Sequence, residues 1–449
     1  MTKLQLTIEK LVYGGDGLAR GDAAEQGRRP AVFLPFVLPG EVVEARVIER
    51  KPKLLRARAE RIVEASPARV EPACPYFAKC GGCQYQHAAY ECQLQSKAEI
   101  LTETVRRLAK VEPPRVEAHG SPPWSYRNRT RLKVRSVEAA GGETRRSFAL
   151  GFHRPGTHEL LAVEQCPISS PLINRAIGAL WKLGRAGLVP EPVQEIELFA
   201  NAQDDALLAE VTLPEAAWKR RWQRSLGEFS AALRQALPET AGVAAFCRMA
   251  NGELRRAEVP DAFRESLGSA ELRYHVAGGE YLVSAGSFFQ TNRHMAETLA
   301  ELVAGGRSGQ SAMDLYAGVG LFTLPLARRF ERVTAVEAAE SSVADLRRNA
   351  PANVRCLAET TERYLAALAA GTTVDLVVAD PPRAGLGERC AQLLTRLAAP
   401  RITYVSCDPA TLARDLKALT AGGYRIEQMH LVDLFPQTFH LESVTQLVR

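Results

Sequence analysis

The sequence predicts a chain of three parts: a small N-terminal β-barrel, a central α+β region and a C-terminal α/β domain. Residues 1–65 contain short alternating β segments separated by turn signals such as YGGDG and LPGE. From Met313 onward, short apolar runs alternate with helical stretches, which is typical of a parallel sheet with crossover helices. A chain of 449 residues is also too long for one core. We therefore expect domains at 1–65, 66–275 and 276–449.

Composition and charge are those of an ordinary globular protein. The chain is 46% hydrophobic and 24% charged, with a net charge of +6 that does not by itself indicate a nucleic-acid partner. The opening residues lack the apolar core of a signal peptide, and no stretch is long and apolar enough to span a membrane. We therefore expect a cytoplasmic protein without a membrane partner.

The N-terminal elements are short strands followed by one clear helix. LQLTIEKLV, PAVFLPFVLPGE and EVVEARVIER alternate as strands of a small barrel do. Residues 91–111 form an amphipathic pattern that predicts a helix, which we expect to pack on the C-terminal domain. The segment EPPRVEAHGSPPW ends this helix, and residues 124–275 mix strand and helix signals without a clear topology.

Cations alternate along one predicted strand of the central region. In YRNRTRLKVR (126–135), every second residue is basic, which places the cations on one face of a strand. They are Arg127, Arg129, Arg131, Lys133 and Arg135. Such a row is either a solvated charged face or a surface for a polyanion. Because the segment has no acidic residue to neutralise it, we infer RNA contacts at Arg127, Arg129, Arg131 and Lys133.

The C-terminal domain places small and polar residues where its strands end. Gly318 and Gly320 in DLYAGVG let a ligand approach the backbone, and Glu337 ends the next strand, where it could bind a ribose. DPPR (380–383) and Cys407 follow later strands. The dinucleotide fingerprint G-x-G-x-x-G is incomplete because Thr323 occupies its third glycine position. S-adenosylmethionine (SAM) is therefore favoured over a nicotinamide cofactor. The last two strand-like runs are expected to close the sheet as an antiparallel hairpin.

Cys407 at a strand end is more suggestive than a cysteine in mid-strand. A thiolate is a strong nucleophile. Methylation of uracil at carbon 5 needs such a group, because attack at carbon 6 turns the ring into an enolate that accepts a methyl group. A base must then remove the carbon-5 proton, and Glu442 in HLESV is a carboxylate that the closing hairpin could return to the same edge. A buried structural thiol and an ordinary surface glutamate are the alternatives.

Three of the nine cysteines are clustered. CPYFAKCGGC gives Cys74, Cys80 and Cys83 in a C-x5-C-x2-C spacing, which is a strong metal signal. A fourth ligand is needed, for which Cys166 and Cys92 are the candidates. Four thiolates suit either zinc or a [4Fe–4S] cluster. The spacing differs from the C-x3-C-x2-C of radical-SAM enzymes.

Together these motifs resemble the RNA uracil-C5 methyltransferases, which make 5-methyluridine. The resemblance covers nearly the whole chain and is greatest for the iron–sulfur branch that modifies 23S ribosomal RNA. It rests on VYGGDGLAR, CGGCQYQHAAYECQLQSK, EQCPI, YRNRTRLKV, GSFFQTN, DLYAGVGLFTLPLA, DPPRAGL, SCDP and HLESV, in that order. It implies a TRAM barrel of OB type, a central iron–sulfur domain and a Rossmann-like class I SAM-dependent catalytic domain.

The resemblance also implies roles for residues. Cys407 would be the nucleophile and Glu442 the general base. SAM would be bound by Gln290, Tyr316, Gly318, Gly320, Glu337 and Asp380. A [4Fe–4S] cluster would be held by Cys74, Cys80, Cys83 and Cys166. Two positions depart from the family pattern: Leu321 replaces a polar residue, and Ala358 stands where an acidic adenine contact is usual, so that Glu359 is the substitute candidate.

The sequence thus predicts a monomeric SAM-dependent enzyme that methylates carbon 5 of a uridine in RNA through a Cys–C6 adduct. Ribosomal RNA is the expected partner, with no obligate protein partner. Transfer RNA is the first alternative substrate. An NAD(P)-dependent iron–sulfur oxidoreductase and a non-catalytic RNA-binding scaffold are the alternatives from other classes.

Overall fold

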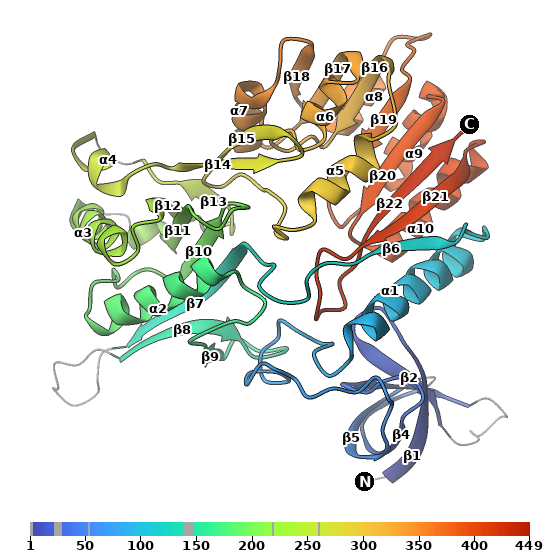
Figure 1. Cartoon of the computed structure of the whole chain (residues 1–449), viewed down its shortest axis with the longest axis horizontal. Coiled ribbons are helices and arrows are strands. Elements are labelled where there is room, and N and C mark those ends of the chain that lie inside the picture. The colour runs from blue at the N-terminus through green and yellow to red at the C-terminus, as the bar shows by residue number, and fades with distance from the viewer. Residues whose placement is uncertain (1–2, 22–28, 53, 138–146, 218–219, 259–260) are drawn as a thin grey trace.

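The computed structural model describes residues 3–21, 29–52, 54–137, 147–217, 220–258 and 261–449 (Figure 1). A barrel, a central sheet and a larger sheet lie side by side. The larger sheet is formed mostly by the C-terminal part of the chain, where the catalytic domain is expected, and is called the catalytic sheet below. Within these ranges, no helix combines the length and apolar character that a membrane crossing requires.

The N-terminal strands close into a barrel, as the sequence predicts. Its strand order is β1-β2-β3-β5-β4. Alternate residues point inward, so that Leu6, Val32, Leu34 and Val43 fill the interior. The strands are β1 (Lys3–Leu11), β2 (Asp16–Arg20), β3 (Ala31–Pro35), β4 (Val42–Lys51) and β5 (Leu54–Glu64).

The central sheet has the order β13-β12-β11-β10-β7-β8-β9. Helices α2 (Pro171–Arg185) and α3 (Arg220–Ala236) cover it through an apolar cluster that includes Leu180 and Phe229. Its strands are β7 (Arg129–Val137), β8 (Ser147–His153), β9 (Leu160–Ala162), β10 (Glu195–Ala200), β11 (Leu207–Pro214), β12 (Thr240–Arg248) and β13 (Leu254–Arg256). A short helix α4 (Asp261–Leu267) precedes the hairpin β14 (Glu271–Val276) and β15 (Gly279–Ser284).

The catalytic sheet is parallel over most of its width and has the order β18-β17-β16-β19-β20-β22-β21-β6. Strand β22 runs antiparallel to both β20 and β21, which confirms the predicted closing strands. The strands are β16 (Gly309–Leu315), β17 (Phe330–Glu337), β18 (Val354–Ala358), β19 (Leu376–Ala379), β20 (Arg401–Ser406), β21 (Arg425–Val432) and β22 (Glu442–Val448).

Helices cover both faces of this sheet, so its central strands are buried. One apolar cluster joins the sheet to α1, α8, α9 and α10, and another joins it to α5, α6 and the β14–β15 hairpin. These helices are α5 (Ala296–Ala304), α6 (Thr323–Ala327), α7 (Glu340–Asn349), α8 (Thr361–Ala367), α9 (Gly387–Leu397) and α10 (Pro409–Ala421).

The segment before the central sheet also belongs to the catalytic domain. Helix α1 (Tyr90–Thr104) continues as a π-helical segment (Val105–Ala109), and its apolar side packs on α10 and β21. Strand β6 (Val116–His119) then pairs in parallel with β21 at the sheet edge (Figure 1). The segment EPPRVEAHGSPPW was expected only to end the helix, and the strand β6 within it was not predicted.

A buried ion pair fixes α1 to the catalytic domain. The Nζ atom of Lys97 donates to Oδ1 of Asp433 at 2.6 Å, and neither side chain has exposed surface. Lys97 also donates to the carbonyl of Phe435 at 3.0 Å, and the Tyr90 hydroxyl donates to the other oxygen of Asp433 at 3.0 Å. Because every charge is partnered, the arrangement fixes the start of the β21–β22 loop.

Candidate active site and cysteine cavity

Five adjacent strands bring the predicted catalytic residues to one edge of the sheet. Strands β17, β16, β19 and β20 are parallel, and β22 is antiparallel, so that its amino end lies beside their carboxyl ends. The chain reverses its direction of winding between β16 and β19, which is where open α/β sheets bind ligands. The predicted site residues Glu337, Asp380, Cys407 and Glu442 all lie at this edge.

Cys407 lies in a short turn between β20 and α10. Asp408 caps the helix, because its carboxylate accepts from the backbone N–H groups of Ala410 and Thr411 at 3.0 and 2.9 Å. The hydroxyl of Thr411 donates to the carbonyl of Arg383 at 3.1 Å and so ties this turn to the DPPR loop. The capped helix fixes the backbone that carries the thiol.

Cys407 and Glu442 are close because their strands are paired. Ser406 of β20 pairs with Ser443 of β22 in antiparallel register. Cys407 follows Ser406 and Glu442 precedes Ser443, so these two residues lie beside each other at the next position. Burial, then the charge of Glu442 and then that of Asp380, raise the pKa of the Cys407 thiol to about 12. The charge of Arg383 opposes this shift.

Two carboxyl groups of this site are also hard to ionise. Glu442 is only 6% exposed, and burial together with the charge of Asp380 raises its pKa well above the usual range. Burial and the charge of Asp314 raise the pKa of Asp380 to about 7. The site therefore resists holding several negative charges at once.

The glycine-containing loop after β16 has the features expected of a cofactor site. Gly318 has φ of +56° with open space where a Cβ would lie, and its N–H donates to Glu337 at 2.9 Å. The other oxygen of Glu337 accepts from the amides of Ala338 and Ala339. Gly320, with φ of +103°, is instead packed against Leu324 and Leu346.

The other predicted SAM contacts have different surroundings. Tyr316 adopts φ of +62°, and its hydroxyl lies 3.9 Å from the sulfur of Cys390. Gln290 is 9% exposed, in a loop whose Thr291 carbonyl accepts from the N–H of Asn128 at 3.0 Å. Leu321 is buried in the core, and Ala358 is exposed at the end of β18.

The four predicted cluster cysteines line one cavity of about 760 Å³. Burial raises the pKa of the Cys83 thiol to about 12, and the other three cysteines act in the same direction, as expected of neighbouring sulfurs. Asn174 holds Cys166 in place by accepting from its N–H at 2.8 Å. Cys92 does not line this cavity, and the carboxylates of Glu99 and Glu41 are the charged groups that act on it.

The cationic strand differs from the prediction at one residue. Arg129 is 9% exposed, donates to the carboxylates of Glu197 and Glu210, and donates to the Ser287 carbonyl at 2.6 Å. The predicted RNA contact of Arg129 is therefore wrong, because carboxylates on β10 and β11 already enclose this side chain and neutralise its charge.

Two other cations of this strand, Arg131 and Lys133, remain partly exposed to solvent. Arg131 and Lys133 also pair with carboxylates of β10, yet their side chains are 51% and 35% exposed. Together with Arg127, they line the cavity that holds the four cysteines. The segment itself contains no acid, as the sequence shows, but the inference that its cations lack carboxylate partners is wrong, because Glu195 and Glu197 pair with them. RNA contacts at Arg127, Arg131 and Lys133 stay a prediction.

Residues that the sequence analysis did not select also reach the site. The hydroxyl of Tyr13, from the barrel, lies 3.4 Å from the carbonyl of Cys407, and its ring meets Phe439 edge-on at 5.4 Å. Arg383 contacts His440 at 3.2 Å, and His440 lines the cysteine cavity. Arg383 belongs to the DPPR motif at a predicted strand end, whereas Tyr13 belongs to the VYGGDGLAR motif of the barrel, which gives no sign of a contact with Cys407.

This fold and site define the class of SAM-dependent methyltransferases, and comparison with known proteins identifies the family. Residues 89–449 match the tRNA (uracil-5-)-methyltransferase family, and residues 2–59 match the TRAM domain. The chain therefore belongs to the RNA uracil-5-methyltransferase family, whose members transfer a methyl group from SAM.

Individual relatives agree over the whole length. The 23S rRNA (uracil(1939)-C(5))-methyltransferase RlmD of Pseudomonas putida is 33% identical over 98% of this chain and 93% of its own length. An uncharacterized RNA methyltransferase of Aquifex aeolicus is 34% identical over 99% of this chain and 98% of its own. The crystal structure of the tRNA (uracil-54, C5)-methyltransferase of Pyrococcus abyssi, in complex with S-adenosyl-L-homocysteine, has a TM-score of 0.73. It is 25% identical and covers 99% of this chain and 100% of its own.

Proposed function

We propose that this enzyme methylates carbon 5 of a uridine in 23S ribosomal RNA, with Cys407 as nucleophile and Glu442 as general base. The observation that carries the proposal is the pairing of β20 with β22, which sets Cys407 against Glu442 at the strand edge. SAM, when bound, would supply the methyl group as an electrophile and would leave as S-adenosylhomocysteine once its sulfur–methyl bond is broken. Gln290, Tyr316, Gly318, Gly320, Glu337 and Asp380 are the residues we assign to its site.

The protein residues act in two steps. The Cys407 sulfur forms a bond to carbon 6, and the electron pair of the C5–C6 double bond moves toward the carbonyl oxygen on carbon 4. Carbon 5 of this enolate then accepts the methyl group. Finally, Glu442 takes the carbon-5 proton, the C5–C6 double bond forms again, and the carbon–sulfur bond breaks to release the Cys407 thiolate.

The electrostatics of the site fit this order. A thiolate at Cys407 and a carboxylate at Glu442 repel each other, as the raised pKa of the thiol indicates. The attack step needs the thiolate, and the later step needs the carboxylate. Once the sulfur is bonded to carbon 6 it is uncharged, so a thiolate no longer repels the Glu442 carboxylate when the base is needed, and only burial and the charge of Asp380 still disfavour that carboxylate.

Ribosomal RNA is the substrate that the relatives favour. The relatives named for 23S rRNA are 33% and 32% identical over 98% of this chain, whereas the tRNA enzyme of known structure is 25% identical. The uridine would be unpaired and turned out of its stack into the pocket. Arg127, Arg131 and Lys133 would contact phosphates, and we expect a monomer acting in the cytoplasm.

We further propose that Cys74, Cys80, Cys83 and Cys166 hold a [4Fe–4S] cluster. They line a single cavity. The charges of Cys74, Cys80 and Cys166 all act on the Cys83 thiol, which supports a site shared by the four sulfurs. Four thiolates can bind one zinc ion or a [4Fe–4S] cluster, and the resemblance to the iron–sulfur branch favours the cluster.

One trapping experiment tests the mechanism and the substrate together. Glu442→Gln retains the shape of the base but cannot accept the carbon-5 proton, so methylated RNA should stay bonded to Cys407. The variant is purified from cells under denaturing conditions, and the attached RNA is sequenced. We expect 23S rRNA with a methyl group on the trapped uridine, and no adduct for Cys407→Ala or for the double variant.

The outcomes separate the parts of the proposal. Methylation by Cys407→Ala would overturn the nucleophile, and normal turnover by Glu442→Gln would move the base to Asp380. Trapped tRNA would keep the mechanism and replace the substrate. Cys356→Ala is the matched control, because this half-buried thiol lies in β18 of the same sheet and should leave activity unchanged.

A further inference from the structure

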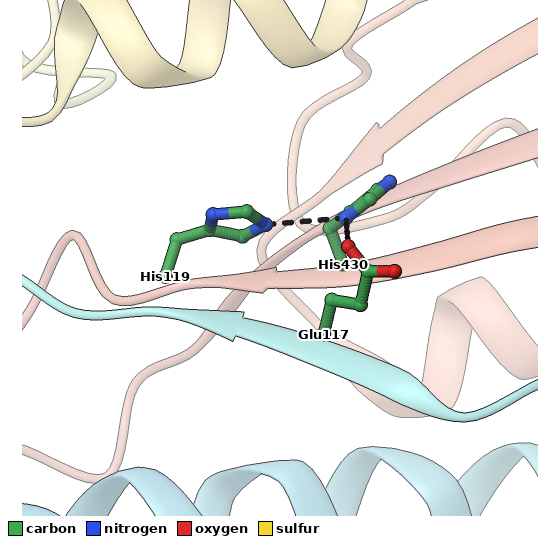
Figure 2. A group of neighbouring side chains, drawn as sticks. All are labelled: Glu117, His119 and His430. Atoms are coloured by element: carbon green, nitrogen blue, oxygen red, sulfur yellow. Dashed lines mark hydrogen bonds and ion pairs between the residues drawn. The ribbon is translucent and has the colours of Figure 1, made fainter.

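Two histidines and a glutamate meet at the edge of the catalytic sheet, outside the residues assigned above. Nδ1 of His430 lies 3.2 Å from Nε2 of His119 and 3.4 Å from a carboxylate oxygen of Glu117. Figure 2 shows both groups directed at the same ring nitrogen, with Glu117 and His119 on β6 and His430 on β21. The three ligand atoms all lie within 4.8 Å of one another.

The strand register explains why these side chains meet. Glu117 pairs with His430 across the parallel strands, and His119 follows Glu117 by two residues. Side chains alternate along a strand, so positions 117 and 119 extend from the same face of the sheet. The apolar neighbours Met429 and Leu431 point to the opposite face, where they pack with α1. The three polar groups are thus held by two backbones rather than by flexible loops.

The spacing matches that of ligands around one small cation. Zinc binds imidazole nitrogen and carboxylate oxygen at about 2.0–2.1 Å, which places neighbouring ligands of a tetrahedron roughly 3.4 Å apart. The two measured separations, 3.2 and 3.4 Å, agree with this value. Two imidazoles and one carboxylate also form a ligand set that zinc uses when its fourth position is open.

We propose that Glu117, His119 and His430 form a binding site for a divalent ion of the zinc type, which links β6 to β21. The side chain of Glu117 is 64% exposed, so the open fourth position faces solvent and would hold water. His430 is almost fully buried. The proposal does not depend on the proposed reaction, because none of these residues is assigned to it.

A shared proton is the competing explanation of the contact. One ring N–H would then serve both the other imidazole and the carboxylate, whereas a cation would use all three lone pairs. The three ligand atoms all lie within 4.8 Å of one another, so a single cation could contact all of them, whereas one N–H points along one direction toward one acceptor.

The ion would stabilise the domain that carries the active site. The carbonyl of His119 accepts from the N–H of Asp433 at 3.0 Å, and Asp433 begins the loop that leads to Glu442. A link between β6 and β21 would therefore hold the base of that loop. Since zinc would bind the folded chain in preference to the unfolded one, its addition should raise the unfolding temperature.

The test uses the full chain with Zn²⁺ alone as the probe. Bound zinc is measured by calorimetry and by elemental analysis after dialysis, and unfolding temperatures are measured with and without the ion. The variants are Glu117→Gln and His119→Gln, whose side chains are not buried, and His430→Gln. His275→Gln is the matched control, because His275 pairs with Glu280 at 2.9 Å on an exposed hairpin without a third ligand.

Each site variant should bind one zinc ion fewer than the parent chain and lose the zinc-dependent rise in unfolding temperature. His275→Gln should retain both. Co²⁺ distinguishes this site from the cysteines, because thiolate ligands give an intense charge-transfer band that nitrogen and oxygen ligands lack. The site variants should leave that band unchanged. Equal zinc binding by the parent chain and by Glu117→Gln and His119→Gln would overturn the proposal, as would an equal loss in His275→Gln.

Discussion

Asp314 is a buried acid directly behind the candidate cofactor site. Its side chain has no exposed surface and accepts a hydrogen bond from the Thr323 hydroxyl. Burial, with a contribution from the charge of Glu337, raises its pKa to about 7. The same Thr323 occupies the position that made the dinucleotide fingerprint incomplete. Its side chain thus donates a hydrogen bond to a buried acid at the position where the third glycine of the fingerprint would allow close packing of helix on strand.

This raised pKa predicts how stability depends on pH. An unfolded aspartate has a pKa of about 3.9, so between about pH 4 and pH 7 the folded chain binds a proton that the unfolded chain does not. The contribution of this proton is fully present below about pH 4 and is lost as pH rises through about 7. Asp314→Asn should remove this part of the pH dependence, on the order of 4 kcal/mol across that range. Urea unfolding at several pH values measures it, and equal slopes for both chains would refute it.

Single residues of the site were predictable where a local pattern marked them. Cys407 and Glu337 follow apolar runs that end at strand tips, so the rule that ligands bind at strand ends selects them without a structure. Tyr13 could not be selected, because it approaches Cys407 from 394 residues away in the chain. No local pattern carries that distance, since it depends on how the barrel docks.

At the scale of single elements, strand β7 shows where a pattern is correct and its interpretation is not. The period of two correctly predicts a strand from Arg129 that places Arg129, Arg131 and Lys133 beside the same carboxylates, whereas Arg127 precedes the strand. Their partners are on β10 and β11, where Glu195, Glu197 and Glu210 lie beside them. The local segment contains no acid, but cross-strand neighbours supply three.

Two arginines of β7 should therefore behave differently when replaced by alanine. Arg129→Ala leaves Glu197 and Glu210 buried with less compensation, so we expect a loss of about 3–5 kcal/mol of unfolding free energy. Arg131→Ala removes a half-exposed ion pair worth at most about 1 kcal/mol. Arg131→Ala should instead weaken RNA binding and reduce, by roughly one unit, the slope of the logarithm of the binding constant against the logarithm of the salt concentration. Denaturant unfolding and salt-dependent RNA titration distinguish the two, and a reversed order would contradict the assignment.

Strand β6 is the element that sequence could not predict. It is four residues long, lies between prolines, and pairs with a strand that begins more than 300 positions later. Its hydrogen bonds are to β21, so neither periodicity nor turn signals within the segment mark it. The helix before it was predictable as a helix, but its buried residues include the polar Gln93, Ser96 and Lys97 beside Ile100 and Leu101, which the pattern alone does not explain.

At the scale of the whole molecule, the loop between β21 and β22 connects the three parts of the chain. The amide of Asn292 donates to the carbonyl of Leu434 at 3.1 Å, and the Tyr126 hydroxyl donates to that of Pro436 at 2.9 Å. The barrel residue Tyr13 contacts Phe439. Since this loop ends at Glu442, the position of the proposed base depends on contacts from every part.

The cysteine segment forms the most direct of these contacts. The N–H groups of Gln84 and Tyr85, immediately after Cys83, both donate to the carbonyl of Gln437 at 3.0 and 2.9 Å. Gln93 of α1 adds a side-chain hydrogen bond to the Gln437 side chain at 3.0 Å and accepts from its N–H at 2.9 Å. A ligand that orders the cysteines would therefore also order residues 433–441.

This coupling predicts the effect of losing the cluster. Cys166→Ser removes one proposed ligand, which lies outside the segment that contacts Gln437. Anaerobically purified parent protein should contain about four iron atoms per chain, and Cys166→Ser should contain far fewer. Hydrogen exchange in residues 433–441 should then be faster, because the amides of Gln84 and Tyr85 are no longer fixed by the cluster beside them.

Cys92→Ser is the control, since Cys92 lies in α1 away from the cavity and should retain both the iron and the slow exchange. Iron retained by Cys166→Ser would reassign the ligand, whereas iron loss with unchanged exchange would show that the loop is held without help from the cluster.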